Sequence, residues 1–446
     1  MKADKYFALT LMLLFTLAGF SGCGQPQADI TEKTDAGLVN IASVETRKLE
    51  TPVYGQEDEQ AAAVAQGANR FAFKLGSLLA KEAGAENLVS SPYSVWLPLA
   101  ALVNAADDAA KPGLLEALET AGISEEDLNH AVSRMLHDLT KQREIETAKE
   151  YGEEFHNPLK IANAIFVGNN VTLKQDFAQL FMDYFRGNVM NVNFQSPDAV
   201  AAVNQWASEN TEGLIPSIVE KFDEDTVAAL ANAIYFSDRW HWEFDPDQTE
   251  EDVFYSPGGE TEASYMLRQG DELTYYEDDE IQALPLSFKT GGGMYILLPK
   301  DGDAQGLLSG MTLEYFEKIQ QNASRSTGKL LLPRFSIESS ISQLKDVLKT
   351  LGVPLFDREA AHLTGGLLEE NIPVWLSDAA HKALIQVDEK GTTAAAVTVM
   401  MAGTTSMPMP TEPFEMICNK PFVFVLYGYT YDGGSQVLFT GMVNQP

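Results

Sequence analysis

The side chains that could do chemistry in this chain do not form a known catalytic motif. Six histidines are scattered along 446 residues, and the sequence has no GxSxG nucleophile elbow, no HExxH helix and no glycine-rich phosphate loop. Only two cysteines occur, Cys23 and Cys418, and no CxxC pair offers a zinc site. We therefore predict that the chain is not an enzyme and holds no metal or cofactor. Cys418 is interpreted as a small buried hydrophobic side chain.

Cys23 is the cysteine whose surroundings indicate a reaction. A basic N-terminus leads into an apolar run that is too short to span a bilayer comfortably. The run ends in Phe20-Ser21-Gly22-Cys23, which resembles a bacterial lipobox, in which the cysteine is diacylated and becomes the mature N-terminus. Several acyl chains would attach the protein stably, since one chain alone is marginal. We predict a lipoprotein-type signal peptide over residues 1–22, with ordinary signal-peptidase cleavage nearby as the alternative.

The second informative stretch runs from Val387 to Pro413. Between Gly391 and Asn419 it contains no Lys or Arg, and no proline occurs before Pro408. Thr and Val favour a strand, an alanine triplet favours a helix, and Gly391 weakens both. Such a segment can be a loop in one state and a strand in another. Its small uncharged side chains would permit burial as a central strand.

Length and charge limit the class of protein. With 446 residues and 45% hydrophobic content, the chain can bury a large core. A formal charge of −33 argues against a nucleic-acid partner, because phosphate binding requires Lys and Arg. Residues 23–59 are polar, punctuated by Pro and Gly, and are predicted to form a flexible tether with an end-to-end distance of roughly 30 Å. We predict one folded domain over residues 60–446.

Apolar periodicity predicts the elements that position these stretches. A helix is expected over residues 61–83, and a short strand followed by a helix around Ser94. Buried strands are expected at 161–167 and 226–236, where apolar residues are nearly continuous. The interval 250–340 is predicted to be dominated by strands, with a helix over 343–352 after it.

Eight short motifs occur in a fixed order along residues 60–446. They are Ser91-Pro92-Tyr93-Ser94; Asn204 with Trp206 and Thr211-Glu212-Gly213; Asn232-Ala233-Ile234-Tyr235-Phe236 with Trp240 and Phe244-Asp245-Pro246; Leu332-Pro333-Arg334-Phe335; Leu351-Gly352; His381-Lys382-Ala383; Glu389-Lys390-Gly391-Thr392; and Asn419-Lys420-Pro421-Phe422-Val423-Phe424. On these motifs the chain resembles the serpins, a superfamily of large metastable protease inhibitors. The resemblance implies an α+β fold of three β-sheets with about nine helices and an exposed reactive-centre loop.

The resemblance implies a suicide-substrate mechanism. A target protease would attack the loop and form an acyl-enzyme ester. The freed upstream arm would enter the central sheet and carry the protease about 50 Å, at ~3.3 Å per residue. Deformation of the protease would then stop deacylation and leave a 1:1 covalent complex. The hinge of the inserting arm would consist of Glu389, Gly391, Thr392, Ala394, Ala395 and Ala396.

The reactive bond is predicted at Thr405-Ser406, with Met401-Ala402 and Ser406-Met407 as alternatives. Because no basic residue is available at these positions, the target is expected to be an elastase-, subtilisin- or papain-like protease and not a trypsin-like one.

Other matched residues are expected to control the opening of the sheet. Ser91, Ser94, Asn232 and His381 would form a polar cluster beneath the point where the central strands part. Trp240 and Glu389 would mark where insertion begins. The basic partner expected for Glu389 aligns with Ser287, with Lys289 nearby, so an ion pair is left open.

The sequence also leaves a second function open, that of a non-inhibitory serpin-fold binding or structural protein on the cell surface. In either case we expect an exported monomer, held at the cell envelope through its N-terminal lipid or otherwise secreted.

Overall fold

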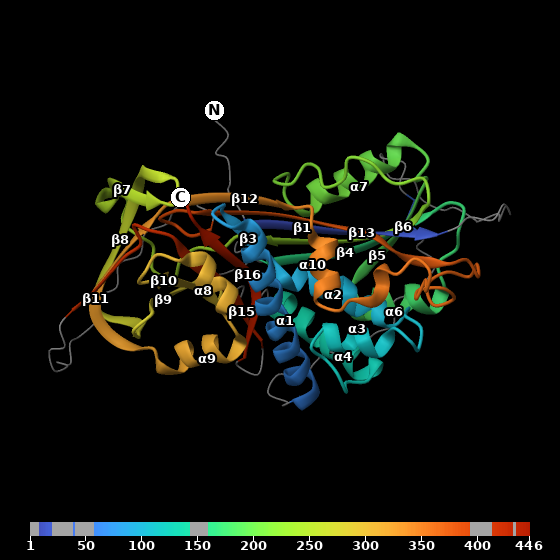
Figure 1. Cartoon of the computed structure of the whole chain (residues 1–446), viewed down its shortest axis with the longest axis horizontal. Helices are drawn as coiled ribbons and strands as arrows, with labels where there is room; N and C mark the ends of the chain where they lie inside the picture. The colour runs from blue at the N-terminus through green and yellow to red at the C-terminus, as the bar shows by residue number, and fades with distance from the viewer. Residues whose placement is uncertain (1–8, 20–38, 41–57, 143–158, 393–412, 431–433) are drawn as a thin grey trace.

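The computed structural model describes residues 9–19, 39–40, 58–142, 159–392, 413–430 and 434–446. Within these residues lie nine α-helices and three β-sheets, as the sequence predicts. A long sheet runs across the molecule, with α7 on one face and most other helices on the opposite face (Figure 1). Among the described residues, no helix is both long and apolar enough to cross a membrane.

Sheet A, the long sheet, has seven strands in the order β12-β13-β1-β6-β4-β5-β2. Strand β1 is antiparallel to both of its neighbours, whereas β4 and β5 are parallel. The strands are β12 (Phe335–Ile341), β13 (Val374–Val387), β1 (Leu9–Gly19), β6 (Thr226–Phe236), β4 (Leu159–Gly168), β5 (Gly187–Val192) and β2 (Val39–Asn40).

The other two sheets share one long strand, β8 (Gly259–Glu277). Sheet C contains β7 (Glu250–Ser256), part of β8, β11 (Ser324–Pro333) and β14 (Phe414–Ile417). Sheet B contains the end of β8, β9 (Ile281–Ser287), β10 (Gly293–Pro299), β15 (Phe422–Tyr429), β16 (Ser435–Val443) and β3 (Leu88–Ser90).

The helices are α1 (Glu59–Ala83), α2 (Pro92–Val103), α3 (Lys111–Ala117), α4 (Glu125–Leu136), α6 (Gln175–Phe185), α7 (Pro197–Asn210), α8 (Ala304–Gly310), α9 (Leu313–Asn322) and α10 (Leu344–Thr350). Two of them, α8 and α9, interrupt the interval that the sequence predicts to be dominated by strands. Helix α1 begins one residue before the predicted domain boundary, where the Asp58 carboxylate accepts a hydrogen bond from Ala61 N at 3.0 Å.

Strand β6 is buried on both faces of sheet A, which explains its nearly continuous apolar run. Leu230, Ile234 and Phe236 belong to the main core, into which α2 is also packed with all its residues buried. Ala229, Ala231 and Ala233 point to the other face, beneath α7. A strand paired with β6 therefore meets buried apolar side chains on both faces.

The N-terminal apolar segment is itself a central strand of sheet A. The sequence predicts residues 1–22 to be a signal peptide, and the core of that segment, Leu9–Gly19, is β1 between β13 and β6. Cys23 and most of the predicted tether lie outside the described residues. Removal of residues 1–22 and lipidation of Cys23 therefore stay predictions.

Candidate functional site

The end of β13 turns sharply and fixes the first hinge residue. Asp388 closes the turn, because its Oδ1 accepts hydrogen bonds from Lys390 N at 2.9 Å and Gly391 N at 3.2 Å. Gly391 has φ +145°, and a Cβ there would lie 2.2 Å from Asp238 O, so the close approach requires glycine. Thr392 is buried and donates from its N to Asp238 O at 2.9 Å. The chain is thus anchored up to Thr392.

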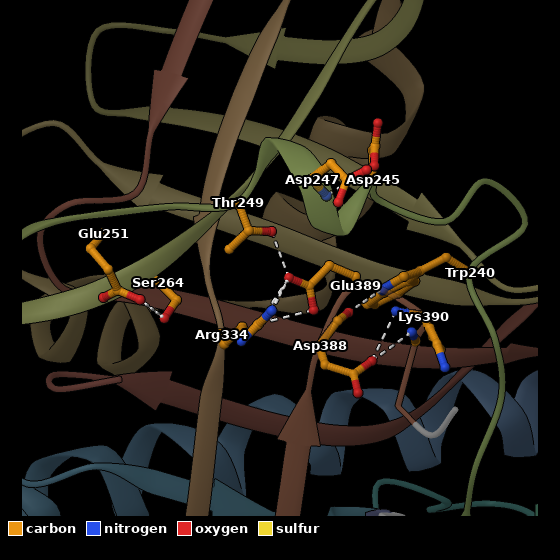
Figure 2. Close-up of polar contacts among 11 residues, drawn as sticks. Trp240, Asp245, Asp247, Thr249, Glu251, Ser264, Arg334, Asp388, Glu389 and Lys390 are labelled. Atoms are coloured by element: carbon orange, nitrogen blue, oxygen red, sulfur yellow. Dashed lines mark hydrogen bonds and ion pairs between the residues drawn. The ribbon is translucent and has the colours of Figure 1, made fainter. Parts of the chain in front are cut away.

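The buried Glu389 side chain forms the ion pair of this turn, and its partner is Arg334 (Figure 2). Arg334 Nε lies 2.9 Å from both carboxylate oxygens, and Arg334 Nη2 also donates to Oε1. Thr249 Oγ1 donates to Oε1 at 2.6 Å. Burial raises the pKa of Glu389, but the hydrogen bonds from Arg334 and Thr249 outweigh it and hold the pKa below its ordinary value. Glu389 is therefore ionised at neutral pH.

The sequence left the ion pair of Glu389 open, because the expected basic position aligns with Ser287 and Lys289 is only nearby. Lys289 Nζ lies instead 3.7 Å from a carboxylate oxygen of Glu243. Arg334 directly precedes β12, whose Phe335 pairs with Val387 of β13, so the antiparallel register brings Arg334 beside the residues that follow Val387. The motif containing Arg334 was visible in the sequence, but its contact depends on the pairing of β12 with β13.

Trp240 donates two hydrogen bonds to the backbone of the same turn. Its indole Nε1 donates to Asp388 O at 2.9 Å, and its backbone N donates to Lys390 O at 2.9 Å. The ring is 1% exposed and stacks on Phe288 with centroids 4.8 Å apart. Trp240 and Glu389, which the sequence places where insertion begins, are therefore in one cluster.

The predicted polar cluster beneath the sheet is connected through the start of α2. Ser91 N donates to His381 Nε2 at 3.1 Å, and Ser94 Oγ donates to Asn232 Oδ1. Ser94 N donates to Ser91 Oγ at 3.4 Å, which links the two pairs. Strand β1 runs between His381 and Asn232, and its Leu13 pairs with His381 on one side and Asn232 on the other. All four predicted side chains are buried, but His381 and Asn232 are held apart by one strand.

Sequence reasoning missed Asn163, which extends the hydrogen bonding of Asn232. Asn232 Nδ2 donates to Asn163 Oδ1 at 2.8 Å, and Asn163 Nδ2 donates to Phe185 O at 2.7 Å. The sequence could have indicated this residue, because Asn163 is the single amide side chain within the apolar run of β4. A buried amide in a central strand needs partners on its neighbours.

His381 is neutral in this environment. Burial lowers its pKa to about 3. Since Nε2 accepts from Ser91 N, the ring proton must be on Nδ1. Nδ1 has no hydrogen-bond partner among the described residues. This arrangement suits a structural histidine and not a proton-transfer group.

The remaining predicted site residues lie outside the described residues. Ala394, Ala395, Ala396, Thr405 and Ser406 fall within 393–412, between the anchored Thr392 and the start of β14. A cavity of about 560 Å³ adjoins the anchored end, lined by residues that include Arg334, Glu389 and Thr392. Within the described ranges, no group of three or more His, Cys, Asp or Glu side chains could hold a metal ion.

Comparison with known proteins gives consistent matches over most of the chain. Residues 66–446 match the family model described as Serpin (serine protease inhibitor). The chain is 30% identical to alpha-1-antitrypsin 1-4 of Mus musculus over 398 residues, which cover 88% of this chain and 91% of that protein. It is 31% identical to the alpha-1-antiproteinase of Mus saxicola over 378 residues, covering 83% and 87% respectively.

Two solved structures share the fold. The native state of tengpin, a thermophilic serpin, has a TM-score of 0.76 at 24% identity and covers 92% of this chain and 100% of that chain. Human thyroxine-binding globulin complexed with its ligand has a TM-score of 0.69 at 22% identity, covering 87% and 99%. At these identities the likeness concerns the fold alone.

Proposed function

Because the chain belongs to the serpin family, we propose that it is a suicide-substrate inhibitor that traps a serine endopeptidase, or a cysteine endopeptidase, as an acyl-enzyme. The protease nucleophile attacks the loop downstream of Thr392, and the cut upstream arm enters sheet A. The relatives named as antiproteinases support an inhibitor over an enzyme.

One observation carries this proposal: sheet A accommodates a central strand that is antiparallel to both β13 and β6. The turn from Asp388 to Gly391 reverses the chain at the end of β13, so an arm inserted after it would run in the same direction as β1 does. A strand in that position can form on the order of a dozen ladder hydrogen bonds at ~1 kcal/mol net each. That free energy is comparable with the whole stability of an ordinary domain, about 5–15 kcal/mol, and is sufficient to deform a protease.

The loop sequence supports the choice of target. With no Lys or Arg between Gly391 and Asn419, a trypsin-like specificity pocket has no residue to bind. We propose Thr405-Ser406 as the reactive bond and an elastase-, subtilisin- or papain-like protease as the partner, in a 1:1 covalent complex. The inhibitor would be a monomer exported by residues 1–22 and attached to the membrane through lipidated Cys23.

A second candidate is a non-inhibitory binding protein of the same fold at the cell surface. The structural similarity to human thyroxine-binding globulin, named as a complex with its ligand, favours this candidate. The small hinge residues Thr392, Ala394, Ala395 and Ala396 argue against it, because an inhibitor requires a hinge that can enter the interior of a sheet.

Protease trapping can be tested directly. A shortened chain that begins at Gly24 is incubated with elastase, subtilisin and papain, and each mixture is examined by denaturing gel and by mass spectrometry of the released peptide. A stable complex near the summed masses is expected, and the N-terminus of the peptide identifies the reactive bond. Cleavage without a complex and without a rise in thermal stability would favour the second candidate.

The hinge provides a matched pair of variants. Ala396→Pro removes a ladder donor from the inserting arm, so this variant is expected to be cleaved without forming a complex. Ala396→Val keeps the donor and a strand-compatible side chain, and is expected to retain most of the complex. An SDS-stable complex formed equally well by Ala396→Pro would contradict loop insertion.

A further inference from the structure

The N-terminal segment occupies the place in sheet A that an inserted loop would need. Strand β1 pairs along Thr10–Gly19 with Leu384–Val374 of β13, and along Leu9–Ala18 with Phe236–Thr226 of β6. In Figure 1 it lies at the middle of the long sheet, between these two strands. The pairing extends over nearly the full length of β6 and most of β13.

Two strands cannot use this position at the same time. The N–H and C=O groups that β6 and β13 direct toward each other are engaged by β1, and these same groups must form the ladder with an inserted arm. With β1 in place, an arm cut from the loop cannot form a ladder with β6 and β13.

The composition of the segment suits the position. Leu9–Gly19 reads LTLMLLFTLAG, with no charged residue and no proline. Strand β6 buries side chains on both sides of the sheet, whereas β13 buries mainly those that face the main core. An uncharged strand fits beside the buried side chains of both. The apolar segment that the sequence predicts to serve export thus also has the uncharged, proline-free composition of a central strand.

We propose that the attached N-terminal segment is an intramolecular plug that keeps the precursor from trapping proteases. This inference rests on the proposed inhibitory function. With β1 in place, a protease still cuts the loop and forms its ester, but the arm cannot insert. Water then hydrolyses the ester, which returns the proton to the protease nucleophile and leaves a new carboxylate on the cut loop. Removal of residues 1–22 vacates the position and activates the inhibitor.

The test uses the chain with residues 1–446 and two variants of Leu13, which lies near the middle of β1. Leu13→Pro removes a backbone donor and places proline in an interior strand, where it is excluded. Leu13→Val keeps the donor and favours a strand. Each protein is titrated against subtilisin and elastase, and the number of chains cleaved per protease trapped is measured. Hydrogen exchange of residues 9–19 is measured in parallel.

The wild type and Leu13→Val are expected to protect the amides of residues 9–19 and to be cleaved as substrates. Leu13→Pro is expected to lose that protection and to consume at least about tenfold fewer chains per trapped protease, since a preference of ~1.4 kcal/mol for β1 already corresponds to a factor of ten.

Three results would overturn the inference. The first is rapid exchange of residues 9–19 in the wild type, which is independent of inhibition. The second is equal trapping by wild type and Leu13→Pro. The third is a Leu13→Pro chain that stays a substrate while the chain beginning at Gly24 traps the protease. In that case the proposed inhibitory function is supported and the proposed plug is refuted. If neither Leu13→Pro nor the chain from Gly24 traps any protease, the proposed inhibitory function is refuted, and so is the plug that rests on it.

Discussion

The ion pair between Arg334 and Glu389 should hold the end of β13 against the neighbouring sheet. The Glu389 side chain is 7% exposed, whereas that of Arg334 is 47% exposed. Replacement of Arg334 by Met would leave the Glu389 carboxylate with Thr249 Oγ1 as its side-chain donor among the described residues. Hydrogen bonds to charged groups contribute about 1.5–3 kcal/mol, and the exposure of Arg334 lowers the expected loss to about 1–3 kcal/mol.

The corresponding shift in melting temperature follows from the size of the domain. An unfolding entropy of ~2.1 cal/mol/K per residue over roughly 390 residues gives about 0.8 kcal/mol/K, so the shift should be about 1–4 °C downward. Thermal melts of Arg334→Met, Glu389→Gln and the double variant form a cycle, in which the double variant should lose less than the two single losses together. Additive losses would refute a direct interaction between the two side chains.

The pH dependence gives an independent check on the same pair. Because the folded pKa of Glu389 lies below its ordinary 4.5, the stabilisation is present above that value and is lost as pH falls through the folded pKa. The difference between wild type and Arg334→Met should therefore shrink in acid. A difference that stays constant from pH 7 into the acid range would mean that Arg334 acts through packing of its aliphatic stem.

Two further predictions concern the buried histidine and the hinge glycine. His381 is neutral when folded, with a pKa of about 3 against an ordinary 6.5, so the unfolded chain binds the extra proton between these values. The free energy of unfolding should therefore fall as pH drops below 6.5, by up to ~1.4 kcal/mol per pH unit. Thermal melts of His381→Gln should show a shallower decline with pH. Parallel declines in wild type and variant would contradict the buried, neutral state of His381. Gly391→Ala should lower the melting temperature, because its Cβ would meet Asp238 O at 2.2 Å in a conformation that costs about 1–3 kcal/mol. Gly258→Ala, with no atom within 4 Å of the added Cβ, is its control, and equal melting of both variants would refute the steric argument.

The features that follow from local sequence were predictable. The run from Thr226 to Phe236 is nearly continuously apolar, and it forms a strand buried on both faces. The hinge motif around Glu389 and Gly391 was recognised, and both residues lie in the turn that the structure describes. These predictions needed only the chemistry of adjacent residues.

The features that depend on strand register were not predictable in the same way. Arg334 and Glu389 are 55 positions apart, and only the pairing of β12 with β13 brings them together. Asn163 and Asn232 meet because β4 and β6 pair at those two residues. From the sequence, residues 1–22 were predicted to be a signal peptide, which stays a prediction; the pairing of Leu9–Gly19 depends on β6 and β13, more than 200 residues further along.

A strand between β6 and β13 stabilises the sheet even though one buried polar group, His381 Nδ1, is left without a partner among the described residues. With β1 present, this unpaired buried donor costs about 1–3 kcal/mol. The strand that separates His381 from Asn232 can form on the order of a dozen ladder hydrogen bonds at ~1 kcal/mol net each, which outweighs that cost. The ladder hydrogen bonds would stabilise any uncharged strand in this position, whether it is the N-terminal segment or the cut loop. Under the proposed plug, an N-terminal segment that is still attached occupies the position before any protease has cut the loop, so the cut arm cannot insert.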